Sequence, residues 1–393
     1  MTKPPTDQPK KRLSKPDSPR PLTTLRFTID EFDDSDTGKP TQFGRFSRNW
    51  DEEEKLDVLL DEMESGRISN KQALMQARKL EASYPDNLEI QNFIANRLWA
   101  LELRDEATEI YEHAFNQALA IIPKDYKGQI AWSEIDNRSF LRLAHGTLLG
   151  QMHRHEGKPA MVLAKKLLAW FPMDNLGVRM LMGDISLLQG DSKAALKTYL
   201  KGAPYSPAHW YQAGQITFRE GDYVAACTYL RRGIAANPYV AEGLTGRTLL
   251  AEHLYWHFSN INGPEWAIDY LEAPVCDWTA EEIDFVDWLF NTTEVLKERA
   301  SLMELHEGLT YEHDAERRDP YVRQISHCVE RISDDQSKDL VRKVKNRYGV
   351  EIWPWDRAGF RNIPPIKTKL KAVKARTQKA EVISRLYKKP ATD

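Results

Sequence analysis

Arginine and amide side chains between residues 137 and 219 have the chemistry needed to hold a carboxylate. A guanidinium offers several N–H donors in a rigid plane, and an amide adds a further donor at a fixed angle. The donors in question are Asn137, Arg138, Arg142, Asn175, Arg179 and Arg219. The alternative is that the arginines pair with acidic residues of the same or neighbouring helices. The acidic residues near them in the sequence are Glu134, Asp136, Asp174 and Glu220.

A pair of histidines is the second candidate for chemistry. His253 and His257 are one helical turn apart and follow Glu252, a spacing that can place two imidazoles on one metal ion. The order of the residues differs from His-Glu-x-x-His, the zinc motif of metalloproteases, and no third ligand is near. We therefore favour packing beside Trp256, and we predict no metal and no cofactor.

The sequence patterns of common catalytic sites are missing. The chain has no phosphate-binding loop, no Gly-x-Gly-x-x-Gly after a strand and no Gly-x-Ser-x-Gly elbow. The carboxylates between Glu281 and Asp287 recur at helical spacing among aromatic residues, which is typical of a solvated helix face. We predict that the protein is not an enzyme and has no catalytic residue.

Composition indicates a protein with a large core and reduced cysteines. The chain has 393 residues, of which 41% are hydrophobic, so it can bury a sizeable core. Cys227, Cys276 and Cys328 lie far apart and offer no disulfide framework, which favours a reducing compartment. No apolar run approaches the roughly 20 residues that span a bilayer. We expect a soluble, cytoplasmic protein without a membrane span.

The net charge of −3 conceals a strong segregation of charge. Residues 1–26 carry +5 and residues 361–393 carry +8, which leaves −16 for residues 27–360. Clustered Lys and Arg bind nucleic acid or an anionic membrane surface by releasing counterions. The alternatives are that the 361–393 tail keeps the protein soluble or folds onto the acidic body. Nucleic acid is therefore a possible second partner, through this tail.

Residues 1–48 are predicted to be disordered, because prolines are frequent and apolar residues are sparse. Within them Leu25, Phe27, Ile29 and Phe32 alternate with polar residues and run into an acidic stretch. A short docking segment would have this pattern. The alternative is an unattached linker.

Helical spacing of apolar residues begins near Asn49 and continues as successive pairs of helices, interrupted at residues 123–137. Two clear copies of one helix–turn–helix unit lie between Leu176 and Val240. The second copy contains Trp210, Ala213, Gly214, Gly221, Tyr223, Ala226, Leu230, Gly233 and Pro238. The first copy repeats the pattern with Gly183, Gly190, Ala195, Tyr199 and Gly202.

This pattern resembles the tetratricopeptide repeat (TPR), which places Trp-x2-Leu-Gly-x2-Tyr, Ala-x3-Phe and Pro over about 34 residues. With the run of residues 130–146 and the segment 237–242, the chain is similar to bacterial stand-alone TPR proteins over roughly residues 70–260. It is more distantly similar to the suppression-of-tumorigenicity-seven family. The copies depart from the pattern where Ala213 and Thr217 replace Leu and Tyr, and where Arg179 replaces Trp. The resemblance implies an all-α fold, a TPR-like α-solenoid, and brings no catalytic residue.

In TPR arrays the first helix of each pair lines a concave groove that binds peptides. The resemblance therefore implies a peptide-binding groove that contains Asn137, Arg138, Arg142, Asn175, Arg179, Tyr211, Gln215 and Arg219. The function that follows is a non-enzymatic scaffold or adaptor that binds a peptide of a protein partner. The alternative is a nucleic-acid-associated or ribosome-associated factor anchored by the basic tail.

The expected organisation has four parts. These are a disordered amino-terminal segment (1–48), a TPR-like helical array (49–263), a carboxy-terminal helical module (264–360) and a basic tail (361–393). Within the module we predict helices at residues 265–271, 280–311, 314–332 and 336–347. Trp353 and Trp355 flank a proline that breaks helix, and we expect this segment to fold back over a groove.

Overall fold

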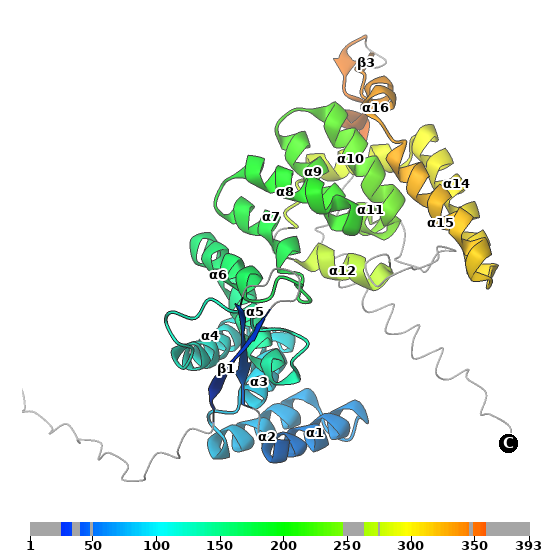
Figure 1. Ribbon diagram of the computed structural model, residues 1–393. Helices are drawn as coiled ribbons and strands as arrows, with labels where there is room; N and C mark the ends of the chain where they lie inside the picture. Colours follow the sequence, from blue (N-terminus) through cyan, green and yellow to red (C-terminus); the bar gives the residue numbers. More distant parts are fainter. Residues whose placement is uncertain are drawn as a thin grey trace, which may run out of the picture. The chain divides into compact units, whose positions relative to one another are not determined.

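A computed structural model describes residues 25–33, 40–47, 50–246, 263–273, 276–345 and 349–358, which are mostly helical (Figure 1). This confirms the predicted helical class. The basic tail and the pair His253 and His257 lie outside the described residues. No described helix combines the length and the apolar character needed to cross a bilayer.

The chain divides into two compact units, whose border falls inside two helices. Unit 1 comprises residues 1–150 and 169–173, and unit 2 comprises residues 151–168 and 174–393. Unit 1 contains strands β1 (Phe27–Asp33) and β2 (Pro40–Phe46) and helices α1 (Trp50–Glu64), α2 (Asn70–Ser83), α3 (Leu88–Ala100), α4 (Arg104–Ala120) and η1 (Ile135–Asn137). Helices α5 (Arg138–His153) and α6 (Gly157–Trp170) cross the border.

Unit 2 continues with helices and two very short strands. Its helices are α7 (Val178–Leu188), α8 (Ser192–Gly202), η2 (Ala203–Tyr205), α9 (Pro207–Arg219), α10 (Tyr223–Ala236), α11 (Pro238–Thr245), α12 (Pro264–Glu272), α13 (Ala280–Phe290), α14 (Thr293–Tyr311), α15 (Ala315–Glu330), α16 (Asp334–Leu340) and η4 (Pro354–Ala358). The strands β3 (Val344–Lys345) and β4 (Glu351–Ile352) pair antiparallel.

Residues 27–33 and 40–46 pair as the two antiparallel strands of a hairpin, although the sequence predicts disorder for residues 1–48. The rings of Phe27 and Phe46 lie 4.9 Å apart, and Phe46 stacks on Phe140 of α5 at 4.4 Å. Phe140 in turn packs on Trp170. The few apolar residues of the hairpin are therefore stabilised by a core that composition alone does not reveal.

One buried amide attaches the hairpin to the helices of unit 1. The Asn137 side chain accepts a hydrogen bond from the Phe46 backbone N–H at 3.0 Å and donates to the carbonyls of Gly44 and Ala131 at 2.9 and 3.2 Å. Asn137 has no exposed surface. Its amide thus replaces water for backbone groups that would otherwise be buried without partners.

Two helical hairpins of unit 2, α7 with α8 and α9 with α10, are built alike. Gly183 of α7 lies against the Tyr199 ring, and Gly214 of α9 lies against Leu230, so a side chain at either glycine would overlap its neighbour. Each turn has a glycine with positive φ, followed by Asp191 or Asp222, which caps the second helix. The close approach of each pair therefore depends on glycine.

Helices α12 and α13, the start of α14 and η4 share one core with α9, α10 and α11, whereas Ile325 and Val329 of α15 belong to a separate cluster. Trp355 of η4 is almost fully buried, and its ring contacts Phe218, Phe285 and Trp288. The Trp353–Trp355 segment thus folds back, and Trp355 becomes part of this core. The predicted helix over residues 280–311 is two helices, because the chain turns at Asn291 and Thr292 caps α14.

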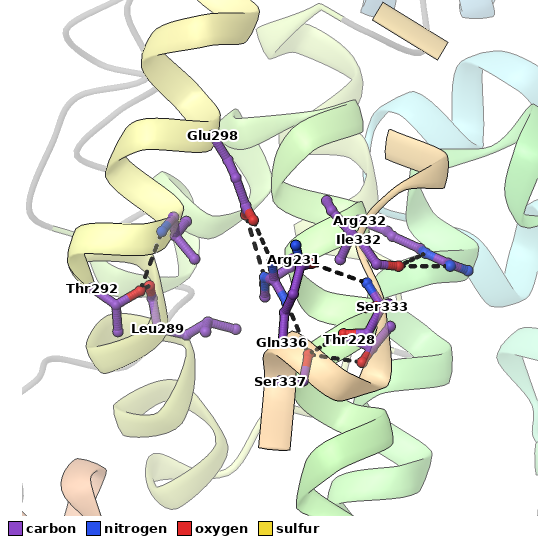
Figure 2. A network of polar contacts seen from close by, with 11 residues as sticks. Thr228, Arg231, Arg232, Leu289, Thr292, Glu298, Ile332, Ser333, Gln336 and Ser337 are labelled. Carbon is purple, nitrogen blue, oxygen red and sulfur yellow. Dashed lines mark hydrogen bonds and ion pairs between the residues drawn. The ribbon is translucent and has the colours of Figure 1, made fainter. Parts of the chain in front are cut away.

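A buried arginine joins three helices of unit 2 (Figure 2). The Arg231 side chain on α10 is 1% exposed and forms an ion pair with Glu298 of α14. It also donates to Ser337 at 3.0 Å and to Gln336 at 3.1 Å, both on α16. Thr228, one turn before Arg231, donates to Ser337 at 2.8 Å. A charged side chain that is shielded from water must have all its hydrogen bonds made by the protein. This network therefore fixes where α14 and α16 pack against α10.

We predict that Asn137→Ala destabilises the hairpin selectively. The variant leaves the Phe46 N–H and two carbonyls without their partner, which should cost roughly 2–4 kcal/mol of local stability. Hydrogen exchange measured by mass spectrometry should show faster exchange across residues 40–46, with little change in α9 and α10. Asn116→Ala, at an exposed position of α4, is the control. Unchanged exchange in the hairpin of the Asn137 variant would contradict this role.

Candidate functional site

The predicted groove residues are divided between the two units, and each unit presents its own candidate surface. In unit 1 the guanidinium groups of Arg138 and Arg142 both lie over the Trp132 ring, with their central carbons 5.3 and 5.6 Å from its centroid. Arg138 also donates to the Trp132 carbonyl at 3.1 Å. Cation–π contacts of this kind hold a guanidinium in place while its edge stays accessible to solvent.

Arg142 has an acidic partner within unit 1. Its side chain lies 3.0 Å from the Glu89 carboxylate, which also accepts a hydrogen bond from Ser139. Glu89 is in the first turn of α3, where the positive end of the helix dipole favours a carboxylate. Arg138 makes no ion pair within the described residues, and its side chain is half-buried. These contacts make Arg138 the more available cation of the two.

In unit 2 the predicted donors of α9 hold a segment of the chain itself. The Nε atom of Arg219 lies 2.6 Å from the Glu282 carboxylate of α13, and another guanidinium nitrogen donates to the Asp277 carbonyl. Gln215 donates to the same two residues, at 3.2 Å to the Glu282 carboxylate and 2.8 Å to the Asp277 carbonyl. The hydrogen bond from Arg219 to Glu282 raises the pKa of the guanidinium. The donors that the sequence assigns to a peptide groove are therefore occupied by Asp277 and Glu282 of the same chain.

Glu282 has two roles that fix it in this position. Its carboxylate accepts the backbone N–H of Thr279 at 2.7 Å, which completes a capping box at the start of α13. The residue is 2% exposed, and Trp278 beside it is also buried. The segment that meets Arg219 is therefore part of the core of unit 2.

The remaining predicted residues have different surroundings. Arg179 pairs with Asp174 at 3.3 Å, the partner that the alternative interpretation names. The buried Tyr211 hydroxyl donates to the Asn237 carbonyl at 2.7 Å and so joins α9 to the start of α11. Asn175 is exposed just before α7. Only Arg179 and Asn175 of this group present polar atoms to solvent.

A set of buried polar groups that we did not predict lies in unit 2. The Tyr270 hydroxyl of α12 accepts from Gln212 of α9 at 3.2 Å and from the Trp278 indole at 3.3 Å. Burial raises the pKa of Tyr270 well above its usual value, so the phenol stays protonated. The Tyr199 hydroxyl donates to the Asp184 carboxylate at 2.5 Å. Polar residues on otherwise apolar helix faces, such as Gln212, are the sequence signal for this set.

Asp184 is the group in this set whose ionisation depends on ordinary pH. Desolvation raises the pKa of its carboxyl from 3.8 to about 6, and the hydrogen bond from Tyr199 opposes that rise. The folded protein therefore binds a proton at Asp184 at a pH where the unfolded chain has already lost it.

We predict that Glu282→Gln destabilises the protein more than Glu281→Gln. The first change removes a buried charge that pairs with Arg219, which should lower the free energy of unfolding by roughly 1–3 kcal/mol. The second changes an exposed residue of the same helix turn and is the control. Urea denaturation followed by tryptophan fluorescence measures both. Equal midpoints for the two variants would show that the Arg219–Glu282 pair contributes no net stability.

We predict that Asp184→Asn becomes stabilising as the pH rises. The pKa of Asp184 is higher in the folded protein than in the unfolded chain. Its contribution to the free energy of unfolding is therefore fully present below about pH 4 and is lost as the pH rises through 6. The asparagine avoids this loss while still accepting the Tyr199 hydrogen bond. The variant should gain roughly 1–3 kcal/mol over the natural protein between pH 4 and pH 7.5. Denaturation series at both pH values measure the gain, and a difference independent of pH would contradict the assignment.

The two surfaces provide hydrogen-bond donors and fixed cations, which are groups that bind anions. Arg138, Arg142 and Trp132 can hold an anionic group in unit 1, whereas Arg219 and Gln215 already hold one in unit 2. No group of three or more His, Cys, Asp or Glu residues suited to a metal ion occurs in the described part of the chain. Comparison with protein-family models and with curated proteins finds no match to this chain.

Proposed function

We propose that this protein is a non-enzymatic interaction scaffold, a TPR-like solenoid that binds an acidic peptide segment of a protein partner. The observation that carries the proposal is the arrangement of Arg138 and Arg142 around the Trp132 ring, with both guanidiniums within 5.6 Å of its centroid. Both guanidiniums are held before any ligand arrives, and Arg138 has no carboxylate partner among the described residues. A preorganised arginine loses little side-chain freedom when it binds a carboxylate.

Two further observations support the scaffold. The hairpins α7–α8 and α9–α10 share the same glycine contacts and the same capped turns, as expected of a repeated unit. The Arg219 and Gln215 side chains bind a carboxylate together with a backbone carbonyl of an extended segment. This internal contact shows the kind of ligand that an arginine and an amide on one helix can bind, namely a carboxylate next to a backbone carbonyl. The proposed peptide site in unit 1 would use Arg138 and Arg142 in a similar manner.

We predict that Arg138→Glu reduces capture of the partner by about tenfold or more, because it replaces an available cation by a repelling charge. The protein would be captured from native cells by affinity, and the eluate identified by mass spectrometry. Arg323→Glu, on the exposed face of α15, is the matched control. The Arg142–Glu89 pair is untouched, so the fold should be retained, and circular dichroism checks this. Equal partner recovery with both variants would refute the unit 1 site.

A nucleic-acid-associated factor is the second candidate function, and its basis is the charge of +8 on residues 361–393. Deletion of this tail separates the candidates. Loss of co-purifying nucleic acid with retained protein partners would assign nucleic-acid binding to the tail and leave the scaffold proposal standing. Loss of protein partners upon deletion of the tail, with Arg138 intact, would count against the peptide site.

A further inference from the structure

The β1 strand has an unpaired edge within the described residues. The sheet contains two strands, and β2 lies on one side of β1. The other side of β2 is already used, because Gly44 and Gln42 exchange backbone hydrogen bonds with Gln129 at 2.8 Å. No described segment bonds to the opposite side of β1. The hairpin of unit 1 therefore ends in an open strand, drawn in dark blue in Figure 1.

The contacts of β2 determine which groups of β1 point outward. Residues that face each other in an antiparallel pair either bond to each other or both point their N–H and C=O groups away. Gln42, Gly44 and Phe46 all bond on the far side of β2, to Gln129 or to Asn137. Their partners across the pair are Glu31, Ile29 and Phe27. These three residues thus direct their N–H and C=O groups away from β2, one pair every 6.6 Å or so.

The side chains near this edge define what can pair with it. Ile29 is 37% exposed, and Asp30 and Glu31 are exposed as well. The Glu31 carboxylate accepts from Gln42, its partner on β2, at 2.7 Å, so it leans toward β2 on one face of the sheet. The edge therefore combines free backbone groups, one apolar side chain and two negative charges.

We propose that this edge of β1 binds an extended, Lys- or Arg-rich segment of a partner protein as a third strand of the sheet. Backbone hydrogen bonds to Phe27, Ile29 and Glu31 supply the affinity, as in other cases of strand addition. Cationic side chains of the incoming strand lie beside Asp30 and Glu31, and an apolar residue covers Ile29. This surface is distinct from the Arg138 and Arg142 site and selects a ligand of the opposite charge.

Charge also disfavours a second copy of the chain as the occupant. Registers that align the acidic residues of two β1 strands would bring Asp30 and Glu31 of both copies together, and like charges on adjacent strands destabilise a sheet. Acidic residues on an edge strand are a usual protection against such self-pairing. The same charges attract a basic strand.

A synthetic peptide with alternating Lys and Val, capped at both ends, is the probe. With the full chain, fluorescence anisotropy should detect binding that is lost when the peptide amides are N-methylated on both edges, because methylation removes hydrogen bonds and keeps the charge. The double variant Asp30→Lys with Glu31→Lys should bind about tenfold more weakly. Asp57→Lys with Asp61→Lys, on the exposed face of α1, is the control for net charge.

A substitution in the backbone tests the edge directly. Ile29→Pro removes the outward N–H and leaves the bonds of β1 to β2 in place, and proline is tolerated on the open side of an edge strand. It should abolish binding, whereas Ile29→Ala should reduce it only in part. The proposal would be overturned if the N-methylated peptide bound as tightly as the unmethylated one, or if both double charge variants bound the peptide equally well. Either result would count even if the proline variant failed to fold. Binding that appears only after deletion of residues 361–393 would identify the chain's own tail as the occupant and would also overturn it.

Discussion

A buried polar group must find a hydrogen-bond partner inside the protein, and this requirement decides how distant segments of the chain meet. In unit 1 the amide of Asn137 binds the backbone of β2 and of the loop before η1. In unit 2 Arg231 holds α14 and α16 against α10, and Glu282 holds the start of α13 against α9. Each contact joins segments far apart in sequence. Apolar burial stabilises the units, but these polar contacts specify which surfaces pack together.

The same requirement determines which arginines remain able to bind a ligand. A guanidinium that neutralises a buried carboxylate, as Arg219 does for Glu282, is part of the fold and would have to lose that partner before it bound another. Arg138 instead rests on an aromatic ring and a carbonyl, and neither neutralises its charge. Residue type alone does not separate these cases, because both residues are arginines at a helix end, Arg138 at the start of α5 and Arg219 at the last position of α9. The partner supplied by another part of the chain separates them.

The sequence predicts the helical class and the two hairpins between Leu176 and Val240, because apolar periodicity and glycine at the turns are local signals. Helix ends at Asp191 and Asp222 follow from capping, which is also local. The β1–β2 hairpin is harder to predict, since Phe46 is buried against Phe140 of α5, and Phe27 packs on Phe46 and Tyr126. The partner of Arg219 could not be predicted either. Glu282 is one of many acidic residues, and only the packing of α13 on α9 selects it.

Internal ion pairs remove one charge of each sign, so they cannot reduce the excess of 16 negative charges between residues 27 and 360. In pairs such as Arg219–Glu282 and Arg231–Glu298, the arginine neutralises a carboxylate of its own unit. These arginines therefore do not neutralise acidic residues at the surface. The field outside this region is on balance attractive to basic ligands and repulsive to acidic ones. Added salt screens both effects. A basic strand on β1 would then bind more weakly at higher salt. For an acidic peptide at Arg138, salt weakens both the attraction of the arginine and the repulsion of the acidic body, so the two effects oppose each other. The salt dependence of binding thus carries information about which surface a partner uses.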